Sequence, residues 1–353
     1  MSYIFTVLVD TILSATKAVI RSARKVVFEA GYVFTDMMRP LHEVFPNVEE
    51  VDLSGVYFDC RDLNGFFANC KKLRKVIFPQ HPLPLRSLTR TFLGCDSLKS
   101  ISLPELPALH SLIETFEHCQ SLEYVELLSI PKIKRMNRVF VYCPKLSMVI
   151  FPTEMIELAR MKDAFMGCEN LNYVRFPEIL PNLWEMVGCF SGKCNATAFA
   201  KFPFKAPKLT VIDNLYTSST LKEVDFSPAE AECITSMKCA FASMRRLTYI
   251  NFGKTKFDLR NERGVELVFR GSPIESISVY FGRVSARSYP NLFKIDYLLD
   301  IVEQETALAN FLTEGGTNIS PMEQMEALWR YAREHPDEYR IGVYVPSRST
   351  VAQ

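Results

Sequence analysis

Ten cysteines and five histidines are the side chains best suited to hold a metal or to act as nucleophile and base. No cysteine lies three residues from another, so the C-x-x-C pairs of structural zinc sites are absent from the sequence. The histidines show no spacing typical of a metal site or of a nucleophile–base pair; they are His42, His81, His110, His118 and His335. We therefore expect neither an enzyme nor a bound cofactor or metal.

Six of the cysteines instead mark an internal repeat. They are separated by 25, 24, 24, 25 and 26 residues, and they are Cys70, Cys95, Cys119, Cys143, Cys168 and Cys194. A phenylalanine stands three residues before each of the first five, at Phe67, Phe92, Phe116, Phe140 and Phe165. Spacing this regular predicts a solenoid in which each repeat is one structural unit.

Each repeat continues with leucine three residues after the cysteine, valine or isoleucine after six, and phenylalanine or leucine after eight. The alternation of apolar and polar residues predicts a short strand, which a following proline often ends. The segment before the cysteine, such as LRSLTRTF at 85–92, predicts one or two turns of helix or 3₁₀ helix. The fold class expected is an α/β repeat solenoid with one parallel strand and one short helix or 3₁₀ turn per repeat of 24–26 residues.

Later repeats keep the pattern without the thiol. Ser218, Met244 and Ser272 stand where cysteine is expected, and the repeat at 194–203 is degenerate. Because the thiol is not required, we interpret the cysteines as small apolar residues packed in the core. Disulfides or a metal site are the alternatives to that interpretation.

The repeats resemble the BspA-like leucine-rich repeats, and the resemblance covers about residues 45–280. The segments that carry it are FLGCDSLKSISLP at 92–104, FEHCQSLEYVEL at 116–127 and FMGCENLNYVRFP at 165–177. The resemblance implies a scaffold for adhesion or protein recognition rather than one defined activity. Many family members are exported, whereas this sequence lacks a clear signal peptide.

We divide the chain into an N-terminal helical cap at 1–42, a solenoid of about ten repeats at 43–284, and a mainly helical C-terminal cap or docking module at 285–353. Residues 2–30 have apolar side chains at helical spacing, with basic residues on the other side. A membrane-surface amphipathic helix, an uptake signal or an interface are alternatives for that segment.

Charge and hydropathy restrict the partners. The 353 residues carry 41 basic and 40 acidic side chains, a net charge of +1, which argues against a nucleic-acid-binding protein. No apolar run is long enough to span a membrane. No basic residue precedes the first apolar run, and Asp10 interrupts it, so an intracellular or assembly-incorporated protein is favoured over a classically secreted one.

Outward positions of the predicted strands are the candidate binding site. Alternation places one column of residues on the open sheet face, where middle strands present aromatic and apolar side chains. The candidates are Tyr124, Met148, Ile150, Tyr173, Arg175, Phe199, Lys201 and Tyr249. Two simpler explanations compete: such residues suit any strand, or a terminal cap covers them.

We expect a non-enzymatic recognition or scaffold protein that binds a protein partner on the concave sheet face, through a cluster of aromatic anchors with a polar rim. One alternative is a structural subunit of a virion, tail or surface adhesin, which would contact its neighbours through the terminal regions. A second alternative is a secreted effector with a functional C-terminal tail.

Overall fold

The computed structural model describes residues 4–7, 17–35, 39–194, 199–247, 249–252, 255, 272 and 276–278. The chain divides into two compact units. The first contains Met1–Leu183 and Lys193–Ala198, and the second contains Trp184–Gly192 and Phe199–Gln353. The C-terminal cap or docking module predicted at 285–353 lies outside the described residues.

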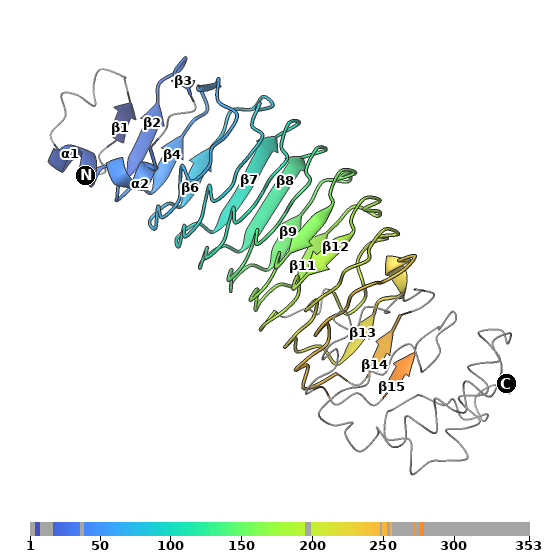
Figure 1. Ribbon diagram of the computed structural model, residues 1–353. Helices are drawn as coiled ribbons and strands as arrows, with labels where there is room; N and C mark the ends of the chain where they lie inside the picture. The colour runs from blue at the N-terminus through green and yellow to red at the C-terminus, as the bar shows by residue number, and fades with distance from the viewer. Residues whose placement is uncertain are drawn as a thin grey trace, which may run out of the picture. The chain divides into compact units, whose positions relative to one another are not determined.

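The first unit is a stack of coils whose strands pair in parallel (Figure 1). One sheet has the order β1-β2-β4-β6, with bounds Ile4–Val7, Lys25–Phe28, Glu50–Asp52 and Lys75–Ile77. A second has the order β7-β8-β9-β11, with bounds Ser100–Glu105, Tyr124–Ser129, Met148–Ile150 and Tyr173–Arg175. Since neighbouring strands come from successive repeats, the predicted parallel repeat solenoid is confirmed.

Shorter elements complete this unit. The strands β3 and β5 pair in parallel along another side of the first coils, and β10 lies in a later coil. Two short helices, α1 and α2, lie near the N-terminus. Their bounds are Val33–Phe34 for β3, Tyr57–Phe58 for β5, Arg160–Lys162 for β10, Lys17–Ser22 for α1 and Leu41–Val44 for α2.

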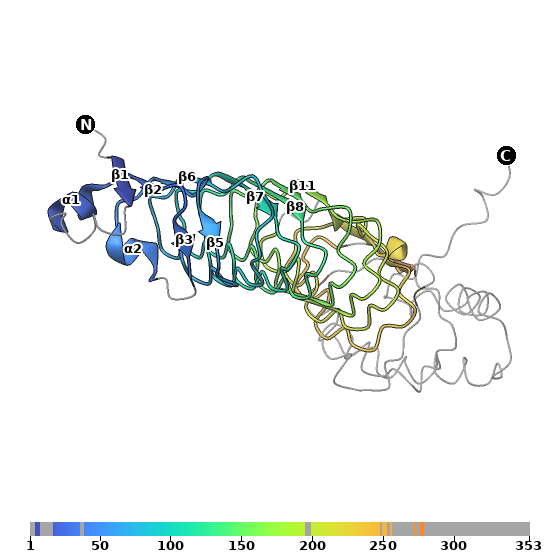
Figure 2. The same ribbon diagram turned by 90° about the horizontal axis from the view of Figure 1, so that it is seen from above.

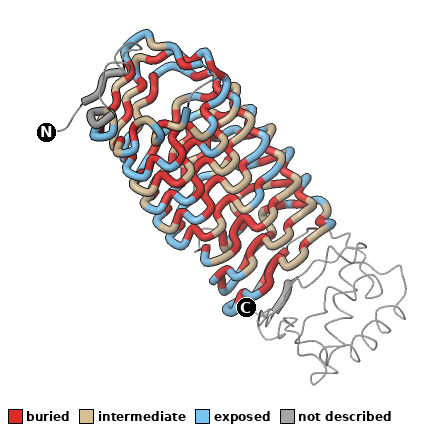
Figure 3. Tube along the Cα trace, turned by 60° about the vertical axis from the view of Figure 1, so that its left-hand side comes forward, coloured by how far each residue is buried: buried red, intermediate tan, exposed pale blue. Residues whose placement is uncertain are grey.

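The predicted phenylalanine column forms the core of the first unit. Its rings stack nearly parallel from coil to coil, with centroids 5.1 Å apart for Phe67 and Phe92 and 5.3 Å apart for Phe92 and Phe116. The stack continues through Phe140 to Phe165. These rings are completely buried, which removes large apolar surfaces from water in every repeat. Buried and exposed stretches therefore alternate along each coil (Figure 3).

The cysteine column lies beside the rings, as predicted for core residues. Each thiol is free and buried, and those of Cys95, Cys119, Cys143 and Cys168 donate a hydrogen bond to the phenylalanine carbonyl of the preceding coil. The Sγ–O distance is 3.1 Å from Cys95 to Phe67 and 3.1 Å from Cys119 to Phe92. Burial raises the pKa of the thiols, so they stay protonated and act as packed hydrogen-bond donors.

The segment before each cysteine is not a helix. In the repeat containing residues 85–92, alternate amides bond back within the chain, as Thr91 N–H does to the Leu88 carbonyl. The intervening amides donate to the next coil, as Arg90 N–H does to the Ile113 carbonyl. The i→i+3 bonds match the predicted 3₁₀-type turns, whereas a continuous helix is wrong because half of the amides are used between coils. Figure 2 shows these turns on the side of the coils away from the strands.

The prediction of a helical N-terminal cap at 1–42 is wrong in the described residues. Strands β1 and β2 join the same sheet as β4, so the sheet starts before residue 43. Glu50 N–H donates to the Arg24 carbonyl just as Lys75 N–H donates to the Glu49 carbonyl, which makes Lys25–Phe28 the strand of an ordinary repeat. Consecutive β-branched residues and an alternating buried pattern explain why this segment is extended.

The second unit continues the repeat. Strands β13, β14 and β15 form one parallel sheet, and their bounds are Glu223–Asp225, Tyr249–Asn251 and Ser276–Ser278. Strand β12 spans Glu185–Val187, and a 3₁₀ helix, η2, spans Ser227–Ala229.

One register prediction in the second unit is off by a residue. Tyr216, not Leu215, joins the aromatic stack, with its ring 5.8 Å from that of Phe241. Ser219 is buried in the cysteine position, and Ser218 is exposed. The repeat has lost one residue between its serine and the following leucine, which shifts the pattern.

Candidate functional site

The outward residues of the second sheet in the first unit form the surface that the sequence predicted. Strand pairing places Met148 opposite both Tyr124 and Tyr173. It likewise places Ile150 beside Arg175. Met148 is 40% exposed and Tyr173 is 48% exposed, while Tyr124 and Ile150 are half-buried. The register therefore brings these five residues together, and we call their outward side chains the sheet face.

Polar groups lie at the margin of the sheet face. Glu126 follows Tyr124 by two residues on β8, and the two side chains form a hydrogen bond. Partial burial, and then this hydrogen bond and the negative charge of Glu126, raise the pKa of Tyr124. The Nε of Arg175 donates to the Phe151 carbonyl at 3.4 Å. The phenol thus stays neutral, and the guanidinium is held by the backbone.

Leu128 belongs to the sheet face and was missed by the sequence analysis. It points outward on β8 and is 53% exposed. Strands β7 and β8 each have six residues, whereas β9 has three. Because β7 is long although it contains Pro104, a proline does not mark the end of the strand, and continued alternation along β8 was the available signal for Leu128.

Three predicted site residues lie in the second unit and behave differently. The prediction that Phe199 faces outward is wrong: it is completely buried, and its ring stacks on Phe190 with centroids 3.9 Å apart. Residue 199 is in a 3₁₀ conformation rather than a strand, so strand alternation does not apply to it. Lys201 is exposed, and its backbone forms an isolated parallel β-bridge with Asp225. Tyr249 is the first residue of β14.

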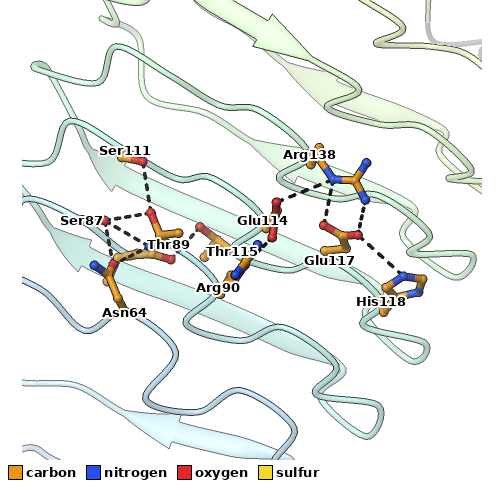
Figure 4. A network of polar contacts seen from close by, with 11 residues as sticks. Asn64, Ser87, Thr89, Arg90, Ser111, Glu114, Thr115, Glu117, His118 and Arg138 are labelled. Carbon is orange, nitrogen blue, oxygen red and sulfur yellow. Dashed lines mark hydrogen bonds and ion pairs between the residues drawn. The ribbon is translucent and has the colours of Figure 1, made fainter. Parts of the chain in front are cut away.

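A network of charged residues lies on the turn side of the first unit (Figure 4). Glu117 is buried, with 7% of its side chain exposed, and accepts hydrogen bonds from Arg138. His118 Nε2 lies 3.7 Å from the same carboxylate. Arg90 pairs with Glu114, which also lies 3.9 Å from Arg138. The hydrogen bond to Glu117 raises the pKa of Arg138, so the guanidinium stays charged beside the buried carboxylate.

The described residues contain no cluster of His, Cys, Asp or Glu that could hold a metal ion. The thiols of the core column are held protonated by burial, which removes their nucleophilic form. None of the helices in this part of the chain is long and apolar enough to cross a membrane.

The part of the chain that resembles known proteins is its repeat region. The sequence matches the BspA type leucine rich repeat region over residues 63–160 and 134–262, together more than half of the chain. Members of that family are generally interaction modules rather than enzymes. No curated protein matches the chain in sequence.

Several solved structures match the chain at low sequence identity and low TM-score. A leucine-rich repeat protein from Bacteroides ovatus is 19% identical over 72% of each chain, with a TM-score of 0.32. The Toll–Spatzle complex from Drosophila is 15% identical over 79% of this chain and 44% of the other, with a TM-score of 0.27. The TLR13–ssRNA13 complex is 10% identical over 80% of this chain and 48% of the other, with a TM-score of 0.26.

Proposed function

Because the chain belongs to the BspA-type leucine-rich repeat family, we propose that it is a non-enzymatic recognition protein that binds a protein partner through the sheet face. The observation that carries the proposal is the row of outward side chains that the register places side by side on β8, β9 and β11: Tyr124, Met148 and Tyr173. Met148 and Tyr173 are 40% and 48% exposed and Tyr124 is half-buried, although all three lie on neighbouring strands of one sheet. Exposed apolar groups that adjoin one another are typical of interaction surfaces.

The composition of the sheet face supports a protein partner. Tyrosine, methionine and arginine are enriched at protein interfaces, and tyrosine and arginine are frequent among the residues that dominate binding energy. Tyr124 and Tyr173 would be the aromatic anchors, on either side of Met148. Glu126 and Arg175 would form part of the polar rim and fix the orientation of the partner.

The backbone beneath the sheet face is already ordered, which lowers the entropy cost of binding a partner. Tyr124 and Met148 sit on strands that are paired on both sides, and Tyr173 and Arg175 sit on β11, which pairs with β9 at the edge of the sheet. Tyr124 is further restrained by Glu126. Since little side-chain and backbone freedom remains to be lost, more of the contact energy would be available as affinity.

The test compares two variants of the full chain. The site variant carries Met148→Ser and Tyr173→Ser, and the control carries Ile156→Ser and Ile179→Ser, two isoleucines that are 55% and 46% exposed outside the strands of the sheet. Wild type and both variants are used to capture partners from the native source, after circular dichroism shows that all three are folded. A captured protein is then purified and titrated by calorimetry.

We expect a partner that wild type and the control retain and that the site variant binds more weakly by about 2 kcal/mol or more, a roughly thirtyfold rise in Kd. A partner held equally by all three proteins would mean that the sheet face is not the binding surface. Turnover of a substrate by the purified chain would contradict the non-enzymatic part of the proposal.

A further inference from the structure

The sheet face has the same arrangement of side-chain types on both sides of its middle strand. Strand β9 lies between β8 and β11 (Figure 1), and the register places Met148 beside Tyr124 on one side and beside Tyr173 on the other. Each flanking strand therefore presents a tyrosine at the same level, and the middle strand presents the apolar Met148 and Ile150. The apolar part of this surface is alike whether it is followed from β8 or from β11.

Opposite charges occupy the two ends of the second outward row. Ile150 lies between Glu126 on β8 and Arg175 on β11. Glu126 accepts one hydrogen bond from the Tyr124 hydroxyl, and Arg175 donates one to the Phe151 carbonyl. A carboxylate accepts up to about four hydrogen bonds and a guanidinium donates about five, so both groups can still bind a charged partner. The row is thus acidic on one side of β9 and basic on the other.

A two-fold axis that runs along β9 in the plane of contact makes this surface complementary to itself. A half-turn about this axis brings a second copy face to face with the first and leaves positions along the strands unchanged. Strand β8 of one copy then lies over β11 of the other. Tyr124 faces Tyr173 of the second copy, and Glu126 faces Arg175 of the second copy. Symmetry makes each of these contacts occur twice.

The remaining outward residues also fit this arrangement. Met148 and Ile150 lie at the axis, where each meets its own counterpart in an apolar centre. The preceding row runs Glu123, Ser147 and Asn172, since the amides of Ser147 and Asn172 donate to the carbonyls of Glu123 and Ser147. The half-turn places Glu123 opposite Asn172 and Ser147 opposite itself. No like charges meet within these three rows, and the ion pairs flank the apolar centre, as is usual for the rim of a specific interface.

The other axis in the plane of contact, perpendicular to the strands, gives a poorer match. It would place β8 over β8 and reverse the position along each strand. Glu126 would then face Tyr124, and Arg175 would face Tyr173, so neither charge would meet an opposite one. Opposite charges across an interface fix which arrangement forms, and only the axis along β9 supplies them.

We propose that the sheet face binds a second copy of this chain in a two-fold symmetric dimer, with β8 of each copy over β11 of the other. This inference rests on the proposed function, since it names the protein that the sheet face binds. A two-fold dimer requires a self-complementary surface, because the same residues serve as both halves of the contact. The three strands present few side chains compared with the roughly 20–30 residues a side of a stable interface, so we expect a reversible dimer with a Kd in the micromolar range.

The test exchanges the two charges in the full chain. Glu126→Arg and Arg175→Glu are made as separate variants, and each puts like charges opposite one another at both symmetric positions of its own dimer. An equimolar mixture of the two variants restores opposite charges at both positions. The matched controls are Glu169→Arg and Lys145→Glu, singly and mixed, which change the net charge equally at exposed residues outside the strands. Sedimentation equilibrium over a range of concentrations gives each Kd, after circular dichroism shows that every variant is folded.

We expect wild type and both controls to dimerise with similar Kd. Each site variant alone should dimerise at least about tenfold more weakly, because like charges face one another. The mixture of the two site variants should recover most of the lost affinity as a heterodimer. Mixing the two controls should leave the Kd unchanged, which separates the ion pairs from the effect of net charge.

A wild-type chain that stays monomeric well above micromolar concentration, or a dimer that neither site variant weakens, would overturn this inference. Equal weakening by the controls, or a mixture of site variants that gains no affinity, would overturn it as well. If a charge reversal does not fold, Glu126→Gln and Arg175→Gln decide, and each must weaken the dimer severalfold. The proposed function is tested separately: a monomeric chain that captures a different protein through the sheet face would refute the dimer and leave that function standing.

Discussion

Raising the pH from 7 to 10 should destabilise this protein through its column of buried thiols. Six cysteines in the first unit have a raised pKa in the folded state, and the value is about 12 for Cys70 and for Cys194 against 9.0 for a free thiol. Burial is the main cause, because the thiolate would lose its hydration without gaining a counterion.

The direction of the change in stability follows from the number of protons bound in the folded and unfolded states. Between pH 9 and 12 the unfolded chain loses protons from these thiols and the folded chain keeps them, so the free energy of unfolding falls as pH rises. At pH 10 each such thiol costs about 1 kcal/mol, from RT ln(1 + 10) with an unfolded pKa of 9.0. The pKa of the other four thiols is raised in the same direction, so their losses add to those of Cys70 and Cys194 as the pH rises.

The assay is urea denaturation followed by circular dichroism at pH 7, 8, 9 and 10 with a reductant present. The comparison variant carries Cys119→Ser and Cys143→Ser. Serine is acceptable at this position, since the Ser272 hydroxyl donates to the Phe241 carbonyl at 2.6 Å in a later repeat. The variant should start less stable at pH 7 but lose less stability on the way to pH 10, because two thiols that ionise only in the unfolded chain have been removed. An identical loss in both proteins would refute the thiol explanation and point to tyrosine or lysine ionisation.

Three further predictions concern the turn side. Arg138→Gln should destabilise the fold by about 2 kcal/mol in urea denaturation, because Glu117 is left buried without its partner, and adding Glu117→Gln should recover most of that loss. Gly65→Ala should cost about 1 kcal/mol, since its φ of +66° disfavours a side chain and nothing lies near the new Cβ. Gly167→Ala should cost more, because the new Cβ would lie 2.7 Å from Cδ1 of Tyr142, and Tyr142→Ala in that background should remove the excess.

The parts of the fold that the sequence predicted are those in which one contact is repeated at fixed spacing. Phe92 stacks on Phe116, and Cys119 bonds back to the carbonyl of Phe92, so the same residue types must recur in each coil. The outward columns of β8, β9 and β11 followed directly, because strand alternation fixes them once the inward residues are known.

The errors arose where apolar spacing fits more than one structure. Apolar residues three and four apart within 2–30 suit a helix, yet Val26 and Phe28 are buried at strand spacing once the sheet of β4 is available to pair with. In the same way, tertiary hydrogen bonds between coils override the helical pattern of 85–92. Phe199 was misplaced because local 3₁₀ structure interrupts the strand, and no residue type in the degenerate repeat signals that change.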